Sequence, residues 1–174
     1  TSEPLDSVTV TDDLGSALAL KPDVAVVTTV SELERLWPQI EPIVAAGVNV
    51  VSTCEELSYP WTTNPDLSEA IDRVAKTASV SVLGTGINPG FLMDTFPLLT
   101  SRVTRDIEKV TVYRIQDASD RRIPFQRKIG AGLTVAEFDA KAETGSLRHV
   151  GLGESLHFLG DYLGLNIARW HETL

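Results

Sequence analysis

The sequence predicts a mixed α/β protein: a doubly wound parallel sheet first, then part of an α+β domain. Short apolar runs of strand length occur at residues 24–27, 49–52 and 80–83, and segments with helical spacing of apolar residues separate them. This alternation is typical of a parallel sheet, whose crossovers are usually helices. Beyond residue 88 the alternation stops and a half-buried strand pattern follows. We therefore expect one domain at residues 1–88 and a second at residues 89–174.

The composition narrows the class of protein. Of 174 residues, 43% are hydrophobic and 22% are charged, as in ordinary globular chains. The net charge of −9 argues against a nucleic-acid or anionic-membrane partner, and no apolar run reaches the ~18–20 residues of a membrane span. A single cysteine, Cys54, leaves no internal disulfide and fits a reducing cytoplasm. The chain starts at Thr1 without a methionine, so we expect a piece of a longer cytoplasmic protein.

The first elements follow from caps and apolar runs. We expect a minimal strand at residues 8–10 and then a short helix to Leu20, capped by one of the polar residues 11–13. The run 24–27 has the continuous apolar character of a central parallel strand and ends at the polar pair 28–29.

A helical pattern comes next, at residues 31–44, where Ser31 and Glu34 form a possible capping box. Pro38 interrupts this pattern. Because a proline inside a helix costs about 3 kcal/mol, we expect a short turn first and a separate helix that begins at Pro38. Gly47 would end that helix.

The stretch 49–56 (NVVSTCEE) contains the next apolar run of strand length. It predicts a short buried strand that delivers Glu55 and Glu56 at its carboxyl end. Ligands of open α/β sheets bind outside the carboxyl ends of the strands, so both glutamates would lie at the usual position of the active site in such sheets. The alternative is that both are solvated loop charges. A helix of about a dozen residues, begun by Asn64-Pro65, then leads to the next strand.

That strand, residues 80–83, runs into the motif Gly84-Thr85-Gly86-Ile87-Asn88-Pro89-Gly90. Its glycines permit close approach of the backbone to a ligand, and Asn88-Pro89 predicts a helix start whose free N–H groups bind a carbonyl or an anion. A glycine-rich turn without a ligand is the alternative. The G-x-G-x-x-G fingerprint of dinucleotide sites occurs nowhere in this chain.

The second half gives weaker signals. We expect an apolar helix at residues 91–99, a strand of an antiparallel sheet at 109–115, and an irregular, locally basic segment at 116–133. A capping box at 134–137 predicts a short helix, and leucines at helical spacing predict a last helix at 152–163.

Other side chains are weaker candidates. Thr28 and Thr29 either contact a ribose or phosphate or simply end a strand, and Cys54 is an inert packed thiol or a nucleophile. The histidines lack compact metal-site spacing, so we expect no metal: they are His149, His157 and His171. Four basic residues form either a solvated face or a site for an anionic group: Arg121, Arg122, Arg127 and Lys128.

Four stretches together resemble the 2,4-diaminopentanoate dehydrogenases and related NAD(P)-dependent amine dehydrogenases of the dihydrodipicolinate-reductase-like superfamily: residues 49–60 (NVVSTCEELSYP), 84–94 (GTGINPGFLMD), 126–133 (QRKIGAGL) and 148–157 (RHVGLGESLH). The resemblance implies a Rossmann domain for NAD or NADP and an α+β domain that covers the substrate and forms a homodimer at full length. It implies that a primary amine is interconverted with a ketone and ammonia.

The resemblance also implies site residues. The family's proposed catalytic glutamate matches Glu55 or Glu56. Distantly similar homoserine dehydrogenases place a functional lysine after V-V-T-A-N, and aligned on residues 50–54 that lysine falls on Glu55, which we therefore prefer. The cofactor-binding residues implied are Thr28, Thr29, Thr53, Cys54, Asn88, Pro89 and Gly90.

This sequence departs from the family pattern in lacking the first strand and glycine-rich turn that hold the pyrophosphate, and the far end of the catalytic domain. We therefore expect weak or no cofactor binding by residues 1–174 alone. Two alternatives stay open. One is a dihydrodipicolinate-reductase-like reductase of C=N or C=O bonds, and the other is an inert ligand-sensing or dimerisation module of the same fold.

Overall fold

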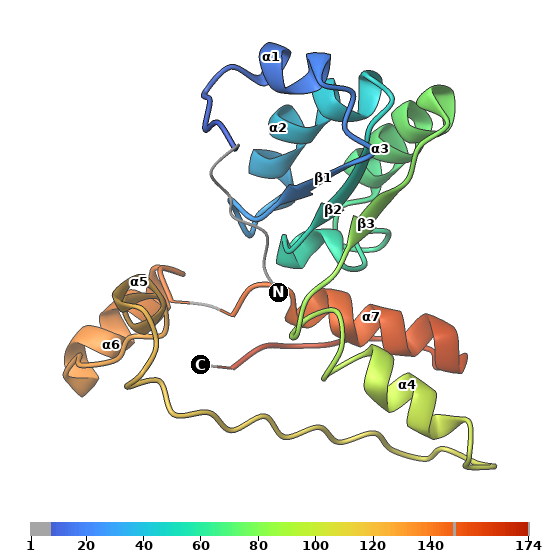
Figure 1. The fold of residues 1–174 in the computed structure, drawn as a ribbon. Coiled ribbons are helices and arrows are strands. Elements are labelled where there is room, and N and C mark those ends of the chain that lie inside the picture. Colours follow the sequence, from blue (N-terminus) through green and yellow to red (C-terminus); the bar gives the residue numbers. More distant parts are fainter. Residues whose placement is uncertain (1–7, 148, 174) are drawn as a thin grey trace, which may run out of the picture.

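A three-stranded parallel sheet forms the centre of the first half in the computed structural model, which describes residues 8–147 and 149–173 (Figure 1). The strands are β1 (Val24–Val27), β2 (Asn49–Ser52) and β3 (Val82–Gly84), in the order β1-β2-β3. Val26, Val51 and Leu83 lie side by side across the three strands. The predicted α/β class with a parallel sheet is confirmed.

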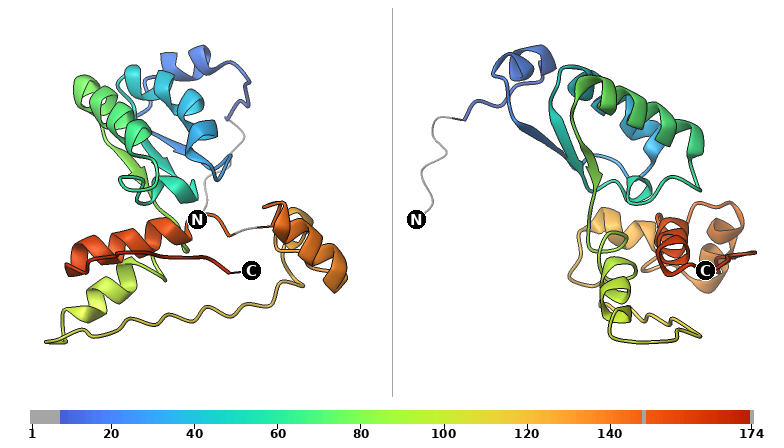
Figure 2. Two further views of the ribbon diagram at one scale, coloured as in Figure 1. Left: turned by 180° about the vertical axis from the view of Figure 1, so that it is seen from behind. Right: turned by 90° about the vertical axis from the view of Figure 1, so that its right-hand side faces the viewer.

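Three helices accompany this sheet: α1 (Leu14–Ala19), α2 (Leu33–Ala45) and α3 (Pro65–Ala78). Asp13 caps α1 by accepting hydrogen bonds from the next backbone N–H groups, as the sequence predicts. Helices α2 and α3 cover the same face of the sheet (Figure 2). The main core lies between them and the strands, and its fully buried side chains include Leu33, Leu36 and Val50. The opposite face keeps apolar side chains exposed, Val26 at 70% and Leu83 at 55%.

Helix α2 is continuous, so the expected break at Pro38 is wrong. Both Pro38 and Pro42 lie inside the helix. Leu36 and Ile40, on either side of Pro38, are fully buried, and burial of each such side chain stabilises by about 1.5–3 kcal/mol. Together they offset the cost of about 3 kcal/mol for an internal proline. The expected capping box is also absent, because the N-cap is Glu32 and not Ser31.

Two expectations about the sheet edge are wrong. Residues 8–10 form no strand, and Val10 is 93% exposed, because no neighbouring strand among the described residues pairs with this segment. Strand β1 lies at an edge of the described sheet and not at its centre, since it pairs with β2 alone.

The described residues of the second half form four helices and a long extended segment. Helices α4 (Thr95–Ser101) and α7 (Leu152–Leu163) pack together beneath the sheet, whereas α5 (Ile123–Lys128) and α6 (Val135–Glu143) lie to one side (Figures 1 and 2). The capping box of α6 and the span of α7 match the sequence expectations. No helix in the described ranges has the length and hydropathy of a membrane span.

Three further expectations fail in the second half. The helix expected from Asn88-Pro89 begins only at Thr95, after a run of turns that Asp94 ends as N-cap. Residues 109–115 are extended but have no partner strand in the described chain, so they form no ladder, and Ile115 is 95% exposed. Residues 116–133, expected to be irregular, contain α5.

Polar contacts hold α7 below the sheet. The Tyr59 hydroxyl donates to Asp161 at 2.7 Å, and the Thr63 hydroxyl donates to the buried Glu154 at 2.6 Å. Asp94, also buried, accepts from the Ser155 hydroxyl at 2.8 Å and so ties the turn before α4 to α7. These contacts bring the segment before α7 against the carboxyl ends of the strands.

Candidate active site at the carboxyl ends of the strands

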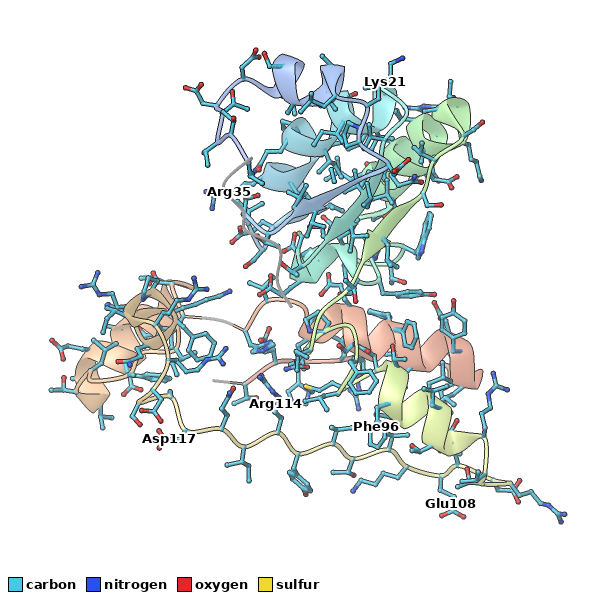
Figure 3. All side chains as sticks on the ribbon, viewed as in Figure 1. Lys21, Arg35, Phe96, Glu108, Arg114 and Asp117 are labelled. Carbon is cyan, nitrogen blue, oxygen red and sulfur yellow. The ribbon has the colours of Figure 1, made fainter. Side chains whose placement is uncertain are left out.

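A cleft of about 460 Å³ opens where the strands end. This volume lies within the range of small-molecule sites. The walls come from parts of the chain that are far apart in sequence. They are formed by residues 28–31, 53, 55, 86–89, 114, 121, 122, 125, 128, 129, 149 and 150. Figure 3 shows one wall residue, Arg114, projecting from the extended segment toward the sheet-bearing half.

Glu55 reaches this cleft from the end of β2. The Thr53 N–H donates to Val27 O at 3.2 Å, so the chain stays beside β1 for one residue past the strand. It then turns into a short 3₁₀ helix, Glu55–Leu57. The Glu55 side chain is partly exposed, and its Oε1 lies 3.8 Å from Lys128 Nζ. The structure therefore puts one carboxylate into the cleft.

Glu56 points elsewhere. Its Oε2 accepts a hydrogen bond of 2.8 Å from the N–H of Leu33, in the first turn of α2, and its own N–H donates to Ser31 O at 3.2 Å. Glu56 does not line the cleft. In an extended segment, two neighbouring side chains would face opposite sides. The segment is a 3₁₀ helix instead, and it is the contact with α2 that separates the two glutamates.

Lys128, in the last turn of α5, closes the cleft opposite Glu55. Besides its ion pair with Glu55, its Nζ lies 3.3 Å from the Ser31 hydroxyl. The lysine thus joins the second half of the chain to the end of β2 and to the loop before α2. Sequence reasoning treated Lys128 only as one of four basic residues, because nothing local indicates which carboxylate a long side chain will meet.

The cleft is rich in positive charge, although the chain as a whole is acidic. Arg114, Arg121 and Arg122 line it together with Lys128, whereas Arg127 does not. Arg121 lies over the Phe125 ring at 4.9 Å, and no carboxylate forms a salt bridge with the three lining arginines within the described residues. Arg114, Arg121 and Arg122 are exposed as well as lining the cleft, so both expectations for these basic residues, a solvated face and an anion site, stay open.

His149 is a wall residue that sequence reasoning missed. Its Nε2 lies 3.3 Å from Asn88 Nδ2. Partial burial, followed by the nearby cations Lys128 and Arg114, holds the pKa of His149 below its ordinary value, while Glu172 and Glu55 act in the opposite direction. The ring is therefore neutral at pH 7. The only available signal was the RHVGLGES stretch, in which no spacing marks the histidine.

The glycines of the GTGINPG motif are required by the close backbone packing of the turn. A side chain at Gly84 would meet Leu57 O at 2.3 Å, and one at Gly86 would meet Pro89 O at 2.7 Å. Gly90, with φ of +116°, lies against Gly86 in the same way. Backbone packing therefore accounts for these glycines without a ligand, and Gly90 does not line the cleft.

The remaining cofactor candidates divide into two groups. Thr28, Thr29, Thr53, Asn88 and Pro89 line the cleft. The Thr29 hydroxyl donates to Gln39 at 2.6 Å, whereas the hydroxyls of Thr28 and Thr53 make no hydrogen bond to another described residue. These two hydroxyls at the strand ends are therefore available to a ligand in the cleft.

Cys54, by contrast, is fully buried and outside the cleft. Its Sγ lies 3.1 Å from Ser31 O, and burial raises its pKa to about 11. The thiol is therefore protonated at neutral pH and acts as a packed core group. Among residues 8–147 and 149–173, no three His, Cys, Asp or Glu side chains gather as metal ligands.

The chain is similar to known dehydrogenases. Residues 91–174 match the family described as 2,4-diaminopentanoate dehydrogenase C-terminal domain. Over 147 residues, 84% of the chain, the sequence is 35% identical to the 2,4-diaminopentanoate dehydrogenase of Acetoanaerobium sticklandii, of which it covers 42%. The fold resembles the amine dehydrogenase from Mycobacterium smegmatis, with a TM-score of 0.72 and 28% identity, covering 94% of this chain and 48% of that one. The chain thus spans less than half the length of either relative.

Proposed function

Because this chain is related to the 2,4-diaminopentanoate and amine dehydrogenases, we propose that the complete protein containing it interconverts a primary amine with a ketone and ammonia. When bound, an NAD or NADP cofactor would accept the hydride from the amine carbon. The observation that carries the proposal is the position of the Glu55 carboxylate, in a cleft at the carboxyl ends of a parallel sheet.

Glu55 is proposed as the catalytic carboxylate. Hydride loss turns the amine carbon into an iminium, and a fixed negative charge close to that nitrogen stabilises the developing positive charge. The same carboxylate can then activate the water that attacks the iminium carbon. Lys128 holds the carboxylate at 3.8 Å, a long ion pair that an incoming ammonium group can replace. Glu56 is not needed for this chemistry, since its carboxylate bonds the start of α2.

The strand ends are proposed to hold the cofactor. The hydroxyls of Thr28 and Thr53 are proposed to bind the nicotinamide ribose, with Asn88 and Pro89 beside the nicotinamide. The 2,4-diaminopentanoate substrate of one relative carries a carboxylate, and Arg114, Arg121 and Arg122 offer it positive charge within the same cleft. We therefore propose an amino acid substrate of this kind in preference to a simple amine.

We propose that residues 1–88 form part of the cofactor domain and that residues 89–174 form part of the substrate domain, the second of which contains the matched residues 91–174. The turn at Asn88-Pro89 joins the two and lies in the wall of the cleft. A homodimer of the complete protein is proposed through the second domain.

The test is the Glu55→Gln variant of the complete protein, assayed for NAD⁺- and NADP⁺-dependent oxidation of 2,4-diaminopentanoate. The substitution keeps the size of the side chain but removes its charge, so kcat should fall about 100-fold or more, equal to about 3 kcal/mol, with cofactor affinity nearly unchanged. Glu56→Gln is the matched control and should retain most activity. Equal activity of Glu55→Gln and the wild-type protein would remove the proposed mechanism, and turnover of only C=N or C=O substrates without ammonia would favour the reductase alternative.

A further inference from the structure

We propose that His149 is a second catalytic residue, which takes the proton that a substrate ammonium must lose before hydride transfer, and that Asn88 positions its ring. This inference rests on the proposed amine oxidation. It assigns a separate task to a residue that faces the same cleft as Glu55 but comes from the other half of the chain.

A proton acceptor is required by the chemistry. Primary amines are ammonium ions at neutral pH, since alkyl ammonium groups have pKa values near 10. An ammonium nitrogen has no lone pair to stabilise the cation that hydride loss creates. One N–H bond must therefore break first. Its electron pair stays on nitrogen, and the proton moves to a base.

His149 is placed to be that base. The backbone that carries it is packed against the site: an added Cβ at Gly151 would lie 2.5 Å from Pro89 Cγ and 3.0 Å from Glu55 Cβ. Only a glycine, here with φ of +95°, brings the segment so close. The imidazole thus shares one cleft with Glu55, while the exposed side of the residue lets the proton pass on to water.

Asn88 controls which ring nitrogen is free. The contact at 3.3 Å joins Asn88 Nδ2 to His149 Nε2. With the amide nitrogen toward the ring, Nε2 accepts and Nδ1 carries the proton. With the amide rotated, its Oδ1 accepts from Nε2–H, and Nδ1 has a free lone pair. In that state Nδ1 takes the substrate proton, and the imidazolium keeps its hydrogen bond to Asn88.

The charges around His149 keep it ready to accept a proton. Partial burial lowers its pKa most, the cations Lys128 and Arg114 lower it further, and the carboxylates Glu172 and Glu55 raise it. The lowered pKa means that the ring is neutral, and able to act as a base, at pH values above about 6.5. As the pH falls through the pKa, the ring becomes protonated and the base is lost.

This division of work leaves Glu55 ionised during hydride transfer, so that it can accept a proton from the attacking water only in the later step. A carboxylate that accepted the ammonium proton would become neutral just as the iminium charge develops, and its electrostatic stabilisation would be lost. With His149 as the base, the carboxylate keeps its charge for the cation and the proton leaves through a different group. The two residues are therefore complementary.

The test compares log kcat/KM against pH for 2,4-diaminopentanoate oxidation by the complete protein and its His149→Gln variant. In the wild-type protein the rate should rise with pH to a plateau that begins below about pH 6.5. In His149→Gln the rate at pH 7 should fall about 100-fold, and it should continue to rise with slope one toward pH 9–10, because the amine must then lose its proton unaided. Glutamine retains an amide for Asn88, so a purely positioning role of the histidine would leave the profile shape unchanged.

Two further measurements complete the test. Added imidazole should restore part of the activity of His149→Ala, and the exposed His171→Gln, outside the cleft, should behave as wild type. In NMR titrations, 2,4-diaminopentanoate should lower the His149 midpoint, because its ammonium group adds a further cation beside the ring. A His149→Gln profile parallel to wild type would overturn the inference while leaving the proposed function standing, whereas an inactive wild-type protein would overturn both.

Discussion

Glu56 allows a separate test of how the two neighbouring glutamates differ. Its carboxylate accepts from the N–H of Leu33 at 2.8 Å and so satisfies one of the free N–H groups at the start of α2. Loss of such a cap costs about 0.5–2 kcal/mol, and charged acceptors stand at the upper part of that range. We therefore expect Glu56→Ala to lower the free energy of unfolding by about 1.5 kcal/mol. For a chain of this size the melting temperature falls by about 3–6 °C.

The measurement is thermal and urea unfolding followed by circular dichroism. Glu56→Gln keeps an acceptor oxygen and loses only the charge, so about 0.5 kcal/mol is expected. Glu41→Ala, at an exposed position of the same helix, is the matched control and should change stability by less than about 0.5 kcal/mol. Glu56→Ala should still retain most of its amine oxidation below its melting temperature. A loss of stability no larger than that of Glu41→Ala would refute the capping role.

Two other predictions concern packing. Gly151→Ala should lower the free energy of unfolding by at least about 1 kcal/mol more than Gly132→Ala does. Both glycines have positive φ, but of the two only Gly151 would place an added Cβ against a neighbour, the ring of Pro89. Equal losses in urea unfolding would contradict the contact. Cys54, buried and with its pKa raised to about 11, should react with a disulfide reagent at pH 8 much more slowly in the folded chain than in guanidinium. Rapid reaction without denaturant would show that the thiol is accessible.

Local signals made most of the first half predictable. The cap at Asp13, the apolar run of β1 and the Asn64-Pro65 start of α3 each depend on a few adjacent residues, and the observed elements begin within about two residues of these signals. The two prolines of α2 were misjudged, because the burial of Leu36 and its neighbours outweighs the local cost. The alternating segment 109–115 was expected to be a strand, but alternation does not supply the partner that a strand requires.

The candidate site was predictable only on the sheet side. Glu55 and Asn88 follow strands, and the carboxyl ends of parallel strands meet at one edge. Their partners come from the other half of the chain: His149 is 61 residues from Asn88, and Lys128 is 97 residues from Ser31. Which distant side chain completes such a wall depends on the docking of α7 and α5, and no spacing in the sequence encodes that docking.

These sequence separations also indicate the order in which the sheet and the cleft form during folding. The sheet closes over short loops, as in the contact of Asn49 with Asp23 across 26 residues, whereas the contacts that complete the cleft span up to 97. Each doubling of a loop adds about 0.6 kcal/mol of closure entropy, so closing 97 residues costs about 1 kcal/mol more than closing 26. Contacts that form when the second half docks offset this cost. Contacts of this range also slow folding. A newly made chain should therefore possess a formed sheet, with Glu55 already at its edge, before it possesses a cleft.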